Sequence, residues 1–176
     1  LELGGKSAQL VFADADLAAA LDGVVEGITG SCGQMCIAGS RLFIQESIAE
    51  QFIAQIRVRF ESLVVGDPRE SGTQVGPQVT KAQAMKTLNY IEIAKKDGGK
   101  VIASSKVPSG ADLASGFYVP PTAFIDLPTS SAAMQEEIFG PVLSIATFKD
   151  EADAISKAHD SDFGLAAGVW TSDLSR

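Results

Sequence analysis

AQLVFADADLAAALDGVVEGITG, residues 8–30, joins a short apolar run to a helical pattern and decides the fold class. Residues 8–12 are apolar except for Gln9, which predicts a buried strand, and Asp14 is the candidate cap of the helix that follows. In that helix apolar residues recur at steps of three and four, so one face is apolar and the helix should end near Gly30. That face is formed by Leu17, Ala20, Leu21, Val24, Val25 and Ile28.

Two capping boxes mark the starts of further helices. Ser47 and Glu50 have the S-x-x-E spacing, and apolar residues at 52, 56, 60 and 63 continue the pattern for about four turns. Thr80 and Gln83 form the second box, which predicts a helix to about residue 97. Gly98 and its neighbour at 99 then supply a left-handed stop.

Strands alternate with these helices. Apolar runs predict them at residues 41–45, 100–103, 122–125 and 142–148. Asp150 caps a last short helix that ends at about His159. This alternation implies parallel crossovers, so the fold class should be α/β, a mostly parallel sheet with helices on both faces. The length of 176 residues fits one domain over residues 1–176.

Composition excludes several classes of function. A net charge of -8 leaves no basic surface for a nucleic acid, and no apolar run approaches the roughly 20 residues that span a bilayer. Two cysteines give no disulfide framework, so we expect a soluble, cytoplasmic protein. The chain begins with Leu1 and has no signal-peptide pattern, so we expect that its true N-terminus is not in view.

Cys36 is the first candidate for chemistry. It lies in GQMCIAGSR, residues 33–41, which we call the cysteine motif, in a glycine-flanked turn between a predicted helix and a predicted strand. Taken alone, a cysteine is more often a small buried apolar residue than a nucleophile. Glycines beside it, however, allow a substrate and backbone N–H groups to approach the sulfur closely. Cys32 meets fewer of these criteria, and its spacing from Cys36 is not that of a C-x-x-C metal site.

Two segments contribute candidate carboxylates. Glu2 lies in LELGGKS, residues 1–7, the N-terminal motif; it is either an ordinary exposed acid or, in a partly apolar pocket, a general base. Glu137 and Phe139 lie in EEIFGPV, residues 136–142, the acidic motif. This motif is either a solvated loop anchored by its aromatic ring or a loop that presents a carboxylate and a ring to a ligand.

Other patterns carry little weight. Residues 5–7, GKS, lack the preceding strand and following helix that a phosphate-binding loop needs, and no G-x-G-x-x-G is present. His159 has no second histidine to complete a metal site, so we expect it to cap or pack its helix end.

The three motifs together, in this order, closely resemble the signature segments of the aldehyde dehydrogenase superfamily. The spacing of Glu2 and Cys36 and the landmarks at residues 66–68, 76–77, 116–122 and 163–165 agree, so the resemblance covers essentially the whole chain. Ser31, His159 and Phe163 depart from the family pattern, where Asn, Asn and Tyr are common. None of these departures touches the expected chemistry.

The resemblance implies oxidation of a small aldehyde to a carboxylic acid with NAD or NADP. Cys36 would form a thiohemiacetal and then a thioester, and Glu2 would activate water or help to deprotonate the thiol. Glu137 would hold the nicotinamide ribose, with Phe139 near the nicotinamide and Leu3 close by. Family members are homodimers or homotetramers, and they carry an upstream dinucleotide-binding domain and a downstream tail that this sequence lacks, so the chain alone should be a poor dehydrogenase.

Two other functions remain open. A non-catalytic structural or binding protein on the same fold has no need to retain both Cys36 and Glu2. A thiol esterase would use the same two residues without a dinucleotide. Glu2 itself favours the hydrolytic reaction, since the branch of the family that transfers the acyl group to coenzyme A commonly lacks that glutamate.

Overall fold

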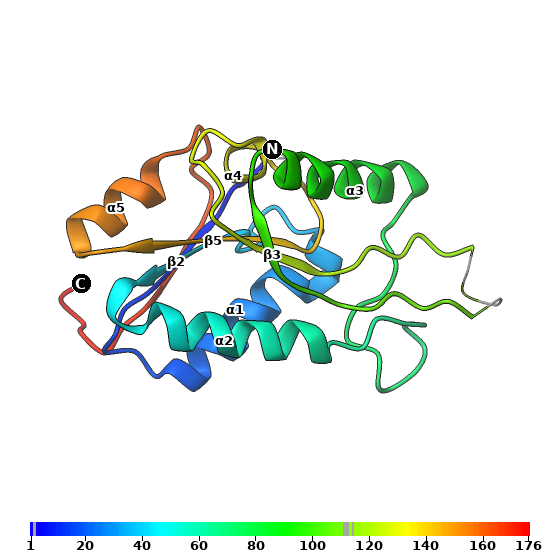
Figure 1. The fold of residues 1–176 in the computed structure, drawn as a ribbon, viewed down its shortest axis with the longest axis horizontal. Helices are drawn as coiled ribbons and strands as arrows, with labels where there is room; N and C mark the ends of the chain where they lie inside the picture. The colour runs from blue at the N-terminus through cyan, green and yellow to red at the C-terminus, as the bar shows by residue number, and fades with distance from the viewer. Residues whose placement is uncertain (2, 111–112, 114) are drawn as a thin grey trace.

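A computed structural model of the chain describes residues 1, 3–110, 113 and 115–176. A single sheet of six strands runs through these described residues in the order β3-β4-β5-β2-β1-β6 (Figure 1). The strands are β1 (Ala8–Val11), β2 (Arg41–Gln45), β3 (Lys100–Ser104), β4 (Thr122–Ile125), β5 (Val142–Phe148) and β6 (Ala167–Trp170).

The pairing is parallel except at one edge. Strand β1 pairs in parallel with both β2 and β6, and β2 and β4 pair in parallel with β5. Among the described strands only β3 runs antiparallel, against β4, with a register shift between Val101 and Ala103. The expected α/β class with a mostly parallel sheet is confirmed.

Helices cover both faces of the sheet. In Figure 1, α1 (Leu17–Thr29) and α2 (Glu46–Ser62) lie below the sheet. The helices α3 (Lys81–Lys96), α4 (Ala132–Gln135) and α5 (Glu151–His159) lie above it. None of the helices in the described ranges has the length and apolar character needed to cross a membrane.

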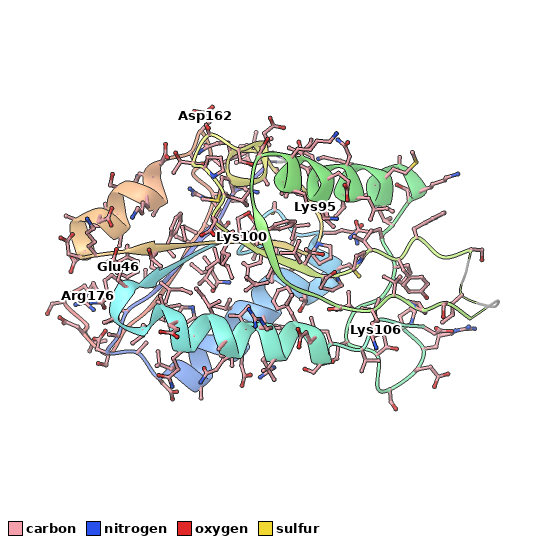
Figure 2. All side chains as sticks on the ribbon, viewed as in Figure 1. Glu46, Lys95, Lys100, Lys106, Asp162 and Arg176 are labelled. Atoms are coloured by element: carbon pink, nitrogen blue, oxygen red, sulfur yellow. The ribbon has the colours of Figure 1, made fainter. Side chains whose placement is uncertain are left out.

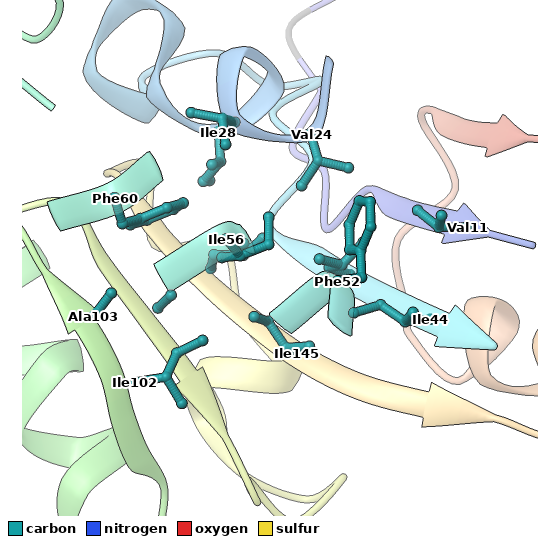
Figure 3. Close-up of a cluster of buried hydrophobic side chains, with 14 of the residues drawn as sticks. Val11, Val24, Ile28, Ile44, Phe52, Ile56, Phe60, Ile102, Ala103 and Ile145 are labelled. Carbon is teal, nitrogen blue, oxygen red and sulfur yellow. The ribbon is translucent and has the colours of Figure 1, made fainter. Parts of the chain in front are cut away.

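The main core lies between the sheet and the helices α1 and α2. Phe52, Ile56 and Phe60 form one fully buried face of α2, at the spacing that the sequence predicts. They pack with side chains from α1 and from the central strands, as Figure 3 shows for Val24 and Ile44. Burying such side chains contributes roughly 1.5–3 kcal/mol each, so this layer fixes the positions of β1, β2 and β5.

Two helix starts differ from the prediction. The cap of α1 is Asp16 instead of Asp14, since its carboxylate accepts the N–H groups of Ala18 and Ala19 at 3.1 Å. Helix α2 begins at Glu46, before the predicted box, and its cap residue Gln45 makes no capping bond with its side chain. The structure thus places Ser47 and Glu50 inside the helix, so the prediction that they form its capping box was wrong.

The other predicted boundaries are confirmed. Thr80 accepts the N–H of Gln83 at 3.1 Å at the start of α3, and Gly98 after its end has a φ of +96°. Asp150 accepts the N–H of Asp153 at 3.0 Å at the start of α5. The sequence analysis did not predict β6, α4 or the short 3-10 helix η1 (Gly30–Gly33).

Candidate active site

The three motifs converge because of the strand order. The N-terminal motif leads into β1, the cysteine motif into β2 and the acidic motif into β5. These strands are neighbours in the sheet and run parallel, so the motifs meet at its amino-terminal edge. Open parallel sheets more often bind ligands at the carboxyl ends of their strands.

Cys36 lies in a tight turn between η1 and β2, and its side chain is exposed. The N–H of Ala38 donates to the carbonyl of Met35 at 3.0 Å and closes the turn. The N–H of Gly39 donates to the carbonyl of Gly27 at 2.9 Å, which attaches the turn to helix α1. The thiol is therefore presented to solvent by a backbone held at both ends.

Gly4 and Gly5 are the contact point of the three motifs. A Cβ added to Gly5 would lie 2.1 Å from the carbonyl oxygen of Cys36, so only glycine permits this approach. The N–H of Gly5 donates to Oε1 of Glu137 at 2.8 Å. A Cβ on Gly4 would lie 3.1 Å from Oε2 of the same carboxylate. The glycine pair thus positions the turn that carries Cys36 and the acidic motif against each other.

A cavity of about 920 Å³ opens beside Cys36. Its lining brings together four of the five residues proposed from sequence, namely Cys36, Glu137, Phe139 and Leu3. Leu3 is 57% exposed and lies at the rim. The fifth residue, Glu2, lies outside the described residues, so its role as general base stays a prediction.

Gln83 and Lys86 also line the cavity and were not singled out as site residues. The side chain of Gln83 donates to the carbonyls of Ile138 and Phe139 at 3.1 and 2.8 Å instead of returning to the start of α3. Nζ of Lys86 donates to the carbonyl of Glu137 at 2.9 Å. Gln83 and Lys86, on one face of α3, therefore hold the backbone of the acidic motif. The sequence predicted only a capping role for Gln83.

The backbone around the cavity adopts uncommon conformations. Phe139 has a φ of +61°, which is rare for a bulky residue and costs on the order of 1–3 kcal/mol. Gly33 has a φ of +70°, and a Cβ there would lie 2.4 Å from the carbonyl carbon of Gly140. The cysteine and acidic motifs are thus packed backbone against backbone.

Cys32 differs from Cys36 in its surroundings. Its thiol donates to the carbonyl of Gly76 at 3.2 Å, and burial raises its pKa. A thiol held in this way has less thiolate and less access to substrate. Both cysteines are free.

Comparison with known proteins adds to this geometry. The family model described as "Aldehyde dehydrogenase family" matches residues 1–176. Betaine aldehyde dehydrogenases from Sinorhizobium fredii and Brucella ovis are 43% and 44% identical over all 176 residues of the chain. The chain spans only 36% of the length of each of these two relatives.

Solved structures show the same fold. Betaine aldehyde dehydrogenase from Staphylococcus aureus, in complex with NAD+, matches 99% of this chain and 35% of its own, with a TM-score of 0.95 and 35% identity. An aldehyde dehydrogenase described as putative, from Burkholderia cenocepacia, matches 99% of this chain and 36% of its own, with a TM-score of 0.94 and 40% identity.

Proposed function

Because the chain belongs to the aldehyde dehydrogenase family, we propose that it supplies the catalytic residues for NAD(P)-dependent oxidation of an aldehyde to a carboxylic acid. The observation that carries this proposal is the cavity of about 920 Å³ in which the exposed thiol of Cys36 lies with Glu137 and Phe139. It has room for a small aldehyde beside a flat aromatic ligand.

Cys36 acts as the nucleophile. Its thiolate attacks the aldehyde carbon, and a thiohemiacetal forms whose oxyanion is stabilised by the backbone N–H of Cys36. Loss of hydride from this carbon leaves a thioester on the sulfur. Glu2 then takes a proton from water, the resulting hydroxide adds to the thioester carbon, and the C–S bond breaks to release the acid and the thiolate.

The lining of the cavity fits a nicotinamide dinucleotide. Glu137 provides a carboxylate for ribose hydroxyls, Phe139 and Leu3 provide apolar contacts for the nicotinamide ring, and Lys86 provides an ammonium for a phosphate. When bound, the dinucleotide supplies the hydride acceptor. NAD+ is present in the complex of the Staphylococcus aureus relative, and the residues named here suit NAD and NADP equally.

The test is the absorbance of NADH or NADPH formed from a panel of short aldehydes. The panel includes betaine aldehyde because relatives carry that name. We expect Cys36→Ala to abolish the signal and Cys32→Ala, the matched control, to retain it. Because the chain spans 36% of its relatives' length, we expect the 176 residues alone to be a poor dehydrogenase, so the same residues are also assayed within a polypeptide of the relatives' length. Absence of a signal there with every aldehyde and both dinucleotides would refute the proposal.

A second function, hydrolysis of activated esters, is favoured by the exposure of the Cys36 thiol within this chain. An ester can acylate this thiol without a dinucleotide. Release of p-nitrophenol from its acetate by the 176-residue chain, with and without NAD+, separates the two functions. Loss of p-nitrophenol release in Cys36→Ala supports the esterase reaction, and release that Cys36→Ala leaves unchanged excludes it.

A further inference from the structure

Lys6 is a buried cation without a partner among the described residues. It lies two residues before the start of β1, it is 2% exposed, and its Nζ makes no hydrogen bond within the described residues. A buried ammonium that is neither solvated nor paired is costly, so such groups normally have a counter-charge or become neutral. Burial of the side chain, followed by the charge of Arg41, lowers the pKa of Lys6 to about 7. The neutral form of the amine is therefore favoured above this pH.

The acids near Lys6 are already engaged. Glu137 and Glu136 raise its pKa from a distance, while Lys86 lowers it. Oε1 of Glu137 accepts the N–H of Gly5, and Oε2 of Glu136 accepts the hydroxyl of Tyr90. Neither carboxylate pairs with the amine.

The neighbouring Arg41 is also engaged. Its guanidinium donates to the carbonyls of Lys6, Lys157, Ala158 and Asp160. These four bonds use four of the five N–H donors of Arg41 and fix it as a structural cation. Lys6 therefore supplies the uncommitted positive group at this place in the described structure.

A pocket of about 350 Å³ adjoins Lys6. It is bounded by Lys6 and Arg41, by His159 at the end of α5 and Ser161 after it, and by residues 163–167 leading into β6. Leu165 lines both this pocket and the Cys36 cavity, so the two hollows are neighbours. The volume is that of a small ligand or one side chain.

We propose that this pocket binds a carboxylate group, which pairs with the ammonium of Lys6. A single uncommitted cation matches a single negative charge. A phosphate dianion is disfavoured because Glu136 and Glu137 lie nearby and the chain carries a net charge of -8. The carboxylate comes either from a small free acid or from an Asp or Glu side chain of a polypeptide. The proposal is independent of dehydrogenase activity.

Protonation of Lys6 and carboxylate binding are coupled. The carboxylate favours the charged amine, so its binding raises the pKa of Lys6 from about 7. At a concentration about ten times its dissociation constant, the rise should be about one unit. In turn, binding should weaken as pH rises through 7, where the free site loses its proton. Because His159 also lines the pocket, a parallel sample carries His159→Gln.

The experiment is a pH titration by NMR of the 176-residue chain with lysine labelled with carbon-13 at Cε. The Lys6 signal is identified by its loss in Lys6→Met. Acetate and a blocked tripeptide whose only carboxylate is a glutamate side chain are the two probes, and inorganic phosphate is the competing anion. Lys106→Met is the matched control, since this lysine lies on the exposed segment after β3 (Figure 2).

We expect the midpoint of Lys6 to rise with acetate, with the tripeptide or with both, and the response identifies the source of the carboxylate. Lys106→Met should respond as the unmodified chain does. Ala166→Phe, which fills the pocket without changing Lys6, should abolish the rise in the Lys6 midpoint. This variant also tests carboxylate binding if Lys6→Met does not fold. A midpoint that stays near 7 with both probes, or a larger response to phosphate, would overturn the proposal.

Discussion

Replacing Lys6 by Met should remove a large pH dependence of stability. In the folded chain the pKa of Lys6 is lowered from 10.5 to about 7, mainly by burial. Below pH 7 the amine is charged in both the folded and unfolded states, and above 10.5 it is neutral in both. Between these values the unfolded state binds more protons, so the free energy of unfolding rises with pH.

The magnitude follows from the size of the shift. Each pKa unit corresponds to about 1.36 kcal/mol, so the unmodified chain should gain roughly 5 kcal/mol relative to Lys6→Met between pH 7 and 10.5. Urea unfolding of both proteins across this range, in buffers without carboxylates, measures the difference. Other titrating groups are common to both proteins and cancel. A difference that is flat or falls with pH would show that the pKa of Lys6 is not lowered in the folded chain.

Four other changes test the site and the core. Gly5→Ala should destabilise the chain by about 2 kcal/mol and alter the alkylation rate of Cys36, because the new Cβ would lie 2.1 Å from the Cys36 carbonyl oxygen; an unchanged rate and midpoint would contradict this contact. Ser31→Asn should raise the free energy of unfolding, measured in urea, by about 0.5 kcal/mol, since the φ of Ser31 is +50° and asparagine tolerates this region better; a lower free energy would argue against it. Phe52→Ala should cost about 3–5 kcal/mol in the same assay, because Phe52 is fully buried, and a loss below about 1 kcal/mol would contradict that packing. Iodoacetamide should label Cys36 before Cys32, whose thiol is partly buried and hydrogen-bonded; peptide mass spectrometry that finds the reverse order would contradict the assignment.

The regular elements were predictable because local patterns determine them. The apolar face of α2 and the cap of α3 at Thr80 are both properties of a few neighbouring residues. The cap of α1 was misplaced because Asp14 and Asp16 are equally good caps by composition. Asp14 is used elsewhere: its carboxylate accepts bonds from Thr171 and Ser172, the first of which is the main cause lowering its pKa to about 2.

Structure that depends on contacts between distant segments could not be predicted from local sequence patterns. Strand β6 has an Ala-Gly-Val-Trp sequence without a clear strand signal and forms by pairing with β1. The start of α2 at Glu46 could not be read from its capping box, because the side chain of Gln45 accepts the N–H of Ala13 beside β1. In both cases a partner far away in sequence decides the local structure.

The candidate site was likewise predictable in its local motifs but not in the contacts between them. Each motif was identifiable from its residues, but their meeting at one edge depends on the order β5-β2-β1, which the sequence alone does not give. The role of Gln83 was missed for the same reason, since its side chain bonds to Ile138 and Phe139, more than fifty residues further along the chain. A glutamine facing away from its own helix start gives no local signal of such a contact.

Three of the four described non-glycine residues with positive φ lie where the motifs meet, and the fourth, Asp126, follows β4. Ser31, Cys32, Gly33 and Phe139 all have positive φ, and of these Phe139 lines the Cys36 cavity directly. Strain of this kind persists only where surrounding contacts hold it in place. Here the close packing of Gly33 on Gly140 and the bonds from Gln83 supply those contacts. The edge where Cys36 is presented is therefore held in uncommon backbone conformations by contacts between the motifs, which supports the proposed site.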